Sequence, residues 1–117
     1  MSLSFDDFVE LLISQMSEEE AHKGIAYAAE KLLPAGSRTQ FNKITVEVSA
    51  DSYLGFIDRD PQANWGHSAR YIIVNQKNAE ISSLETRFPP FGSSSGLTWR
   101  LIYKAPAVPN IYSEHPT

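Results

Sequence analysis

Hydrophobic residues near the N-terminus recur at a helical spacing. Six of them follow positions i, i+3, i+4, i+7, i+8 and i+11, which places them on one face of a helix: Phe5, Phe8, Val9, Leu12, Ile13 and Met16. Ser4 precedes this run and can cap it, and Asp6 and Asp7 follow in the first turn, where the helix dipole favours negative charge. The pattern predicts a first helix that begins at Ser4.

A second helix is predicted directly after Met16. Ser17 with Glu20 three residues later is a capping box, and a stripe of small or apolar residues then continues at helical spacing: Ala21, Ile25, Ala28 and Leu32. Residues 34–36, Pro-Ala-Gly, end the helix. The helical part therefore covers residues 4–33, either as two helices with a very tight link or as one long bent helix.

After Gly36 the hydrophobic period changes from 3.6 to 2. Ile44, Val46 and Val48 alternate with polar residues and predict a half-buried strand. A second strand at 53–57 is expected to pair with it through a hairpin turn at 49–52. Three more strands are predicted in the same way, at residues 69–75, 81–88 and 98–103, so that the sheet covers residues 41–103.

The connections between these strands are mostly short, which favours antiparallel pairing because a parallel pair needs a crossover of about a dozen residues or more. We therefore expect an α+β fold in two layers, with two N-terminal helices packed on one face of a mostly antiparallel sheet of four to five strands. The length of 117 residues suits one domain, 1–117. The proline-containing tail, 104–117, is expected to be an extended strap or a loose terminus.

Composition narrows the classes of function. The formal net charge is −4 and the basic residues are scattered, which argues against nucleic-acid binding. The chain contains no cysteine, so disulfides, thiolate metal sites and cysteine nucleophiles are excluded. No apolar run is long enough for a membrane-spanning helix, and the acidic start lacks the basic region of a signal peptide. These features predict a soluble cytoplasmic protein that does not enter a membrane, with a mature exported form as the alternative.

The loop 58–68 holds the densest group of chemically useful side chains. Asp58, Asp60 and His67 could converge on a metal ion, or one of the aspartates could orient His67 as a general base. Asp-Pro sequences also define turns without further function, and Trp65 could either pack on the sheet or contact a partner. We favour the structural or binding interpretation, and we expect no cofactor.

A second candidate segment covers residues 87–97. Gly92 to Gly96 match G-x-S-x-G with Ser94 at the centre, but the expected strand before this motif and helix after it are missing, which argues against a hydrolase. Phe88 and Phe91 instead stand beside prolines and could serve as rigid apolar anchors of a contact loop.

Four arginines could form an anion site: Arg59, Arg70, Arg87 and Arg100. Arg70 and Arg87 could be neighbours across a hairpin, but a solvated face of the sheet is the simpler expectation for all four. The acidic residues 18–20 are explained by the helix dipole alone.

We find no family signature in these motifs and assign no catalytic residue. The favoured hypothesis is a small protein-binding module of the inhibitor, immunity or adaptor type that uses loops 58–68 and 87–97, and its partner would be another protein. The expected contact residues are Trp65, His67, Arg87, Phe88 and Phe91. The alternative is a small ligand- or metal-binding domain or enzyme centred on His67 with Asp58 and Asp60. A third possibility is an oligomerisation domain that pairs through an open sheet edge.

Overall fold

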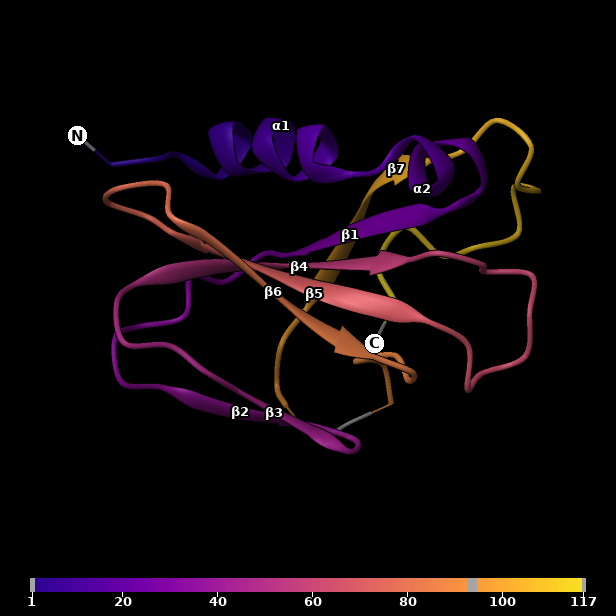
Figure 1. The fold of residues 1–117 in the computed structure, drawn as a ribbon. Coiled ribbons are helices and arrows are strands. Elements are labelled where there is room, and N and C mark those ends of the chain that lie inside the picture. Colours follow the sequence, from indigo (N-terminus) through magenta and orange to yellow (C-terminus); the bar gives the residue numbers. More distant parts are fainter. Residues whose placement is uncertain (1, 93–94, 117) are drawn as a thin grey trace.

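The computed structural model describes residues 2–92 and 95–116 and contains two short helices followed by seven strands (Figure 1). The elements are α1 (Phe5–Gln15), α2 (Glu18–Lys23), β1 (Ile25–Ala29), β2 (Arg38–Phe41), β3 (Ile44–Glu47), β4 (Ser52–Asp58), β5 (Ala69–Asn75), β6 (Ile81–Thr86) and β7 (Trp99–Lys104).

Both predicted helix starts are confirmed. In α1 the Ser4 side chain accepts from the backbone N–H of Asp7, and the Asp7 carboxylate accepts from the backbone N–H of Ser4. In α2 Ser17 and Glu20 make the same reciprocal pair. Each capping box satisfies backbone donors that a helix N-terminus leaves unpaired.

The predicted helical part is wrong from residue 25 onward. The helix α2 ends at Lys23, and the C-cap residue Gly24 donates its backbone N–H to the carbonyl of Glu20 at 2.7 Å. Residues 25–29 then form the strand β1, and all five are buried. A strand covered on both faces shows a continuous apolar run rather than an alternating pattern, so the spacing of Ile25 and Ala28 resembled a helix by coincidence. One long bent helix is excluded for the same reason.

The main sheet has five strands in the order β6-β5-β4-β1-β7, and every neighbouring pair is antiparallel. This confirms the predicted α+β class with a mostly antiparallel sheet. The predicted hairpin between Ile44 and Ile57 is wrong, because β3 pairs with β2 in a separate two-stranded sheet. The strand β2 was not predicted, because Arg38, Thr39 and Gln40 show no alternation of apolar and polar residues. Asn42 forms the β2–β3 turn in the left-handed region, with φ of 43°.

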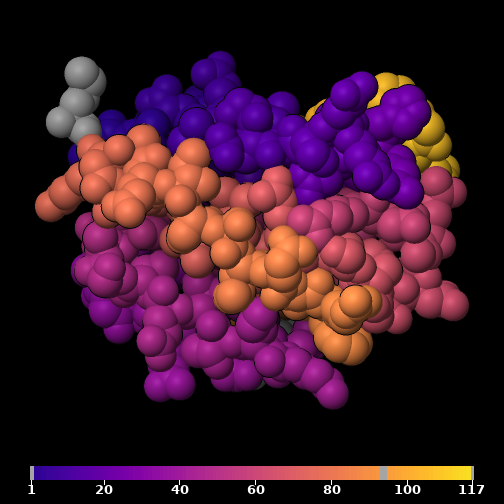
Figure 2. All heavy atoms as spheres, viewed as in Figure 1, coloured from indigo at the N-terminus to yellow at the C-terminus, as the bar shows by residue number. Residues whose placement is uncertain are grey.

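Two hydrophobic clusters lie on opposite faces of the sheet. On one face the helix residues Phe8 and Leu12 pack with Ile57 and Ile72, so the helices cover that face as predicted. On the other face the β2–β3 hairpin and the segments after β6 and β7 cover an aromatic cluster. Its buried members are Tyr27, Phe41, Phe56, Tyr71 and Trp99. The sheet is therefore enclosed from both sides, and Figure 2 shows the helices and the hairpin as separate bands with β6 between them.

The tail forms a strap, one of the two expected alternatives. The backbone N–H of Leu101 in β7 donates to the carbonyl of Glu114 at 2.7 Å. The Tyr112 hydroxyl donates to the carbonyl of Pro61 at 2.8 Å and so ties the tail to the 58–68 loop. No helix within the described residues is long and apolar enough to cross a membrane.

Candidate binding site

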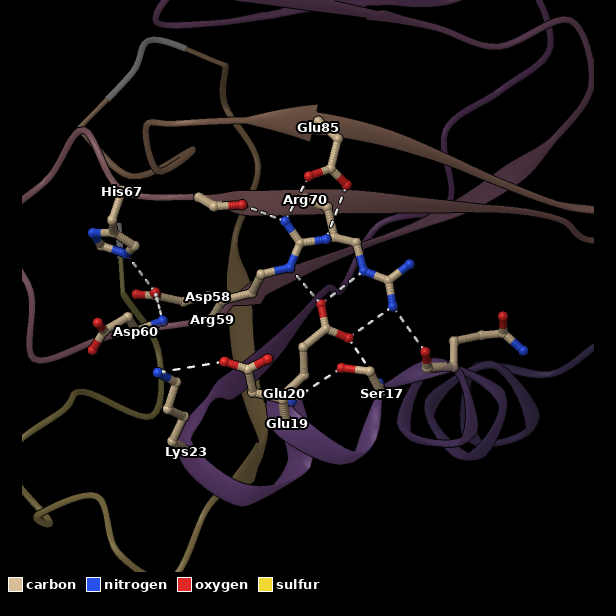
Figure 3. A network of polar contacts seen from close by, with 12 residues as sticks. Ser17, Glu19, Glu20, Lys23, Asp58, Arg59, Asp60, His67, Arg70 and Glu85 are labelled. Atoms are coloured by element: carbon tan, nitrogen blue, oxygen red, sulfur yellow. Dashed lines mark hydrogen bonds and ion pairs between the residues drawn. The ribbon is translucent and has the colours of Figure 1, made fainter.

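The 58–68 loop begins where β4 ends, and it folds back on its first residue. Asp58 is buried, with 5% of its surface exposed. Its Oδ1 accepts from the backbone N–H of Asp60 at 3.0 Å and from Nε2 of His67 at 2.7 Å. The other ring nitrogen, Nδ1 of His67, lies 2.8 Å from the carbonyl oxygen of Asn64. Figure 3 shows His67 and the backbone nitrogen of Asp60 both directed at the Asp58 carboxylate.

The hydrogen bonds of His67 favour its protonated form. Each ring nitrogen lies within hydrogen-bond distance of an oxygen atom, an arrangement that the imidazolium ion satisfies with its two N–H donors. Partial burial opposes the charge, but the Asn64 carbonyl and the Asp58 carboxylate outweigh it and raise the pKa of His67. Burial also raises the pKa of Asp58, against the opposing effect of its bond to His67.

In this geometry His67 is poorly placed to act as a general base or as a metal ligand. A general base needs a nitrogen free to take a proton, and a metal ligand needs a nitrogen lone pair, whereas both nitrogens of His67 are occupied. Within residues 2–92 and 95–116, no group of three or more acidic or histidine side chains could hold a metal ion. Asp58 and His67 thus come together as anticipated and close the loop, whereas Asp60 contributes its backbone N–H rather than its carboxylate.

Trp65 lies on the outside of this closed loop. Its ring stacks on the imidazole of His67, with centroids 4.4 Å apart and planes inclined by 19°. It also stands 6.3 Å from the ring of Phe56 at the margin of the aromatic cluster. Even so, 42% of Trp65 is exposed. The loop therefore holds a large aromatic surface in a fixed place and leaves much of it in contact with water.

Arg87 joins the two candidate loops. Its Nη1 donates to the carbonyl of Gly66 at 2.9 Å, and its own carbonyl accepts from the Gly66 N–H at 3.0 Å. Gly66 has a φ of +106°, a conformation that side chains disfavour. The segment after β6 is thus clamped to the tip of the 58–68 loop next to Trp65.

Phe88 and Phe91 are less exposed to solvent than Trp65. Phe91 is half-buried and meets the rings of Tyr27 and Trp99 edge-on, at 4.9 and 6.0 Å. Phe88 is also half-buried, with Nζ of Lys43 5.7 Å above its ring. The central residue of the G-x-S-x-G match, Ser94, lies outside the described residues.

A charge network that the sequence did not reveal lies on the helix side of the same strand end (Figure 3). Glu20 of α2 is 3% exposed. Its carboxylate accepts from Nε and Nη2 of Arg70 at 2.9 and 2.8 Å and from Nε of Arg59 at 2.8 Å. Arg59 also donates to Glu85 of β6 through Nη2 at 2.9 Å. Two arginines and two glutamates thus neutralise one another between helix and sheet.

This network corrects the expectations for the arginines and for Glu20. Arg59 and Arg70 do not lie on a freely solvated face, and their guanidinium groups are engaged by carboxylates rather than available to an anion. The register of β5 and β6 places Arg70 opposite Glu85, not opposite Arg87. Burial opposes ionisation of Glu20, but the bonds from Arg70, Ser17 and Arg59 prevail and lower its pKa to about 2. Its role therefore exceeds that of a helix cap.

Comparison with known proteins yields no match among protein-family models, curated proteins or solved structures. The interpretation of this site rests on its geometry.

Proposed function

We propose that this protein is a protein-binding module whose contact surface is centred on Trp65 and extends over loops 58–68 and 87–97. The single observation that carries the proposal is the exposed, firmly held indole of Trp65. Tryptophan and arginine are enriched among the residues that dominate binding energy at interfaces, and here Arg87 lies beside Trp65 and clamps its loop.

The bracing of the loop supports the proposal through the entropy of binding. Ordering a side chain or loop when a complex forms costs free energy, and a surface that is already ordered avoids this cost. The stack on His67, the bonds to Asp58 and Asn64 and the Arg87 clamp order the loop beforehand. Phe91 supports the surface from below, and Phe88 lies at its margin.

The form of the surface favours a protein over a small ligand. Small-molecule sites are concave and largely apolar, whereas Trp65 projects from a loop. A hollow of about 220 Å³ beside Arg87 has a polar lining of Ser68, Glu85, Thr86 and Arg87. This hollow could receive one polar side chain of a partner.

The test is capture of partners with the tagged protein from lysate and culture medium of its source. Trp65→Ala and Arg87→Ala remove the proposed contacts. Ile13→Ala is the matched control, because Ile13 is 38% exposed on α1, away from the loops. We expect a protein that the wild type and Ile13→Ala retain and both loop variants lose, and that binds the purified wild type directly. Equal recovery by all four proteins, or no specific recovery by any, contradicts the proposal.

A further inference from the structure

The two edges of the main sheet differ in how well they are protected from pairing with another strand. At the β7 edge the tail strap contributes a backbone hydrogen bond, from Leu101 N–H to the Glu114 carbonyl, and the β1–β7 register is interrupted between Ala26 and Tyr27. The β6 edge pairs with β5 in an unbroken register from Thr86 to Ile81. It contains neither proline nor lysine, two residues that commonly protect an edge strand from pairing with another chain.

The register shows which backbone groups of β6 point outward. In antiparallel pairs, residues alternate between those bonded to the neighbouring strand and those facing away from it. The N–H of Asn75 donates to the carbonyl of Glu80 at 2.9 Å, so even-numbered residues of β6 bond to β5. Ile81, Ser83 and Glu85 therefore direct their backbone N–H and C=O groups away from the sheet. No residue that the structure describes makes a hydrogen bond to the outward backbone N–H and C=O groups of these three residues.

The free edge is accessible and has a defined end. Ser82, Ser83 and Glu85 are exposed, and β6 lies at the molecular surface in the view of Figure 2. The helix α1 packs against β1 and β4 rather than over this edge. Beyond Glu85, the Gly66 N–H occupies the carbonyl of Arg87, so the clamp on the loop closes the edge at that point.

We infer that β6 is a self-association surface, on which the β6 strand of a second copy pairs antiparallel about a two-fold axis at Ser83. With the axis at this residue, every outward-facing residue of one copy lies opposite an outward-facing residue of the other. Ser83 lies opposite Ser83 of the second copy, and Ile81 of each copy lies opposite Glu85 of the other. Three outward residues on each strand then form hydrogen-bonded pairs, and the two five-stranded sheets join into one.

The side chains of β6 suit this self-pairing and identify a second copy as the occupant. No two like charges stand opposite each other, which would disfavour pairing, because Glu85 faces Ile81 of the other copy. A small serine lies on the axis, where a side chain meets its own copy. On the hairpin side of the sheet, Leu84 would lie opposite Ser82 of the second copy. An interface of this kind uses one patch twice and closes as a dimer.

Cysteine cross-linking tests the register, and the cysteine-free chain makes it unambiguous. In a hydrogen-bonded antiparallel pair, facing Cα atoms are about 5.5 Å apart, within the range of a disulfide. Ser83→Cys should therefore form a covalent dimer under mild oxidation. Ser82→Cys is the matched control. Ser82 is the preceding residue and is also exposed, but its copy in the dimer would lie diagonally at about 7–8 Å, too far for a disulfide without backbone movement. Equal cross-linking of both variants would indicate random collision and overturn the inference, as would the absence of cross-linking in both.

Light scattering over a range of concentrations, with and without Ser83→Pro, provides the second measurement. The N–H of Ser83 points outward, so proline there preserves the bonds between β5 and β6 while removing the central donor of the dimer. We expect the wild type to be dimeric at high concentration and Ser83→Pro to be monomeric with an unchanged circular dichroism spectrum. A wild type that stays monomeric at all concentrations overturns the inference. If Ser83→Pro fails to fold, the cross-linking pair decides alone. The result does not depend on the proposed role of Trp65.

Discussion

Glu20 in α2 and Arg70 in β5, fifty residues apart in the chain, bind each other through both carboxylate oxygens and two guanidinium nitrogens. The contact joins the short second helix to the sheet, and Arg59 and Glu85 extend it to the edge strand. Because Glu20 is almost fully buried, a change at this position should affect the whole protein.

Replacing Glu20 by glutamine should be strongly destabilising. Removing one partner of a buried ion pair leaves the other charge uncompensated and typically costs about 3–5 kcal/mol, and here two arginines would lose their shared anion. Glu19→Gln is the matched control, since the Glu19 side chain is 79% exposed and its ion pair with Lys23 is a surface pair, worth about 0–1 kcal/mol. Urea unfolding measures both. A similar small loss in the two variants would show that the network contributes little.

The same carboxylate should make the protein sensitive to acid. In the folded state the pKa of Glu20 falls from its ordinary value of 4.5 to about 2. A lowered pKa contributes stability that is fully present above 4.5 and is lost as the pH falls toward 2. We expect the free energy of unfolding to decline through this interval, and the decline to be shallower in Glu20→Gln. Parallel curves for the two proteins would assign the acid sensitivity to other groups.

His67 should have the opposite dependence on pH. Its pKa is raised above the usual 6.5, so its contribution to stability is fully present below 6.5 and is lost as the pH rises through the folded value. Loss of the proton breaks one of its two bonds and leaves Asp58 buried without a cationic partner. We expect amide exchange in the 58–68 loop to quicken with pH by more than the intrinsic increase, as NMR can measure.

Asp58→Asn provides the control for this effect. Removing the carboxylate removes a main reason for the raised pKa, so the imidazole signals of His67 should titrate at lower pH than in the wild type. An unchanged titration midpoint would mean that the Asp58 contact does not set the protonation of His67.

Gly55 in the centre of β4 should not tolerate a side chain. An added Cβ would lie 2.7 Å from both terminal carbons of Leu12 in α1, closer than any relaxed contact. Overpacking of this kind costs about 1–3 kcal/mol. Gly55→Ala should therefore destabilise the wild type but cost much less in a Leu12→Ala background, where the space is free. A double-mutant cycle by urea unfolding measures this coupling, and strict additivity would contradict the close contact.

Features with a local sequence signal could be predicted from the chain alone. The cap at Ser4, the capping box at Ser17 and the strand patterns of residues 69–75 and 81–88 depend on neighbouring residues only. These elements are present in the structure, although β6 ends at Thr86 rather than at residue 88. The strand β1 was missed because burial on both faces removes the alternation that identifies a strand, while its alanines favour a helix. Gly24, placed at the end of the capped turn, was the available hint.

The same distinction between local and long-range signals applies to the candidate site. Asp58 and His67 lie in one loop, so their convergence could be anticipated. The Glu20 network joins α2, the end of β4, β5 and β6, and its geometry depends on a strand order that the sequence does not specify. The occupied nitrogens of His67 also could not be foreseen, because the bond to the Asn64 carbonyl depends on the path of the loop.

The position of β1 between β4 and β7 has a consequence for how the chain reaches this structure. The strands β4, β5 and β6 are consecutive and can pair as they emerge, but β1 needs β7, whose residues lie most of the chain away: Ala29 pairs with Trp99. Contacts between such distant residues slow folding, because loop-closure entropy is lost before they form. During synthesis, β1 would therefore keep one edge unpaired until β7 has left the ribosome.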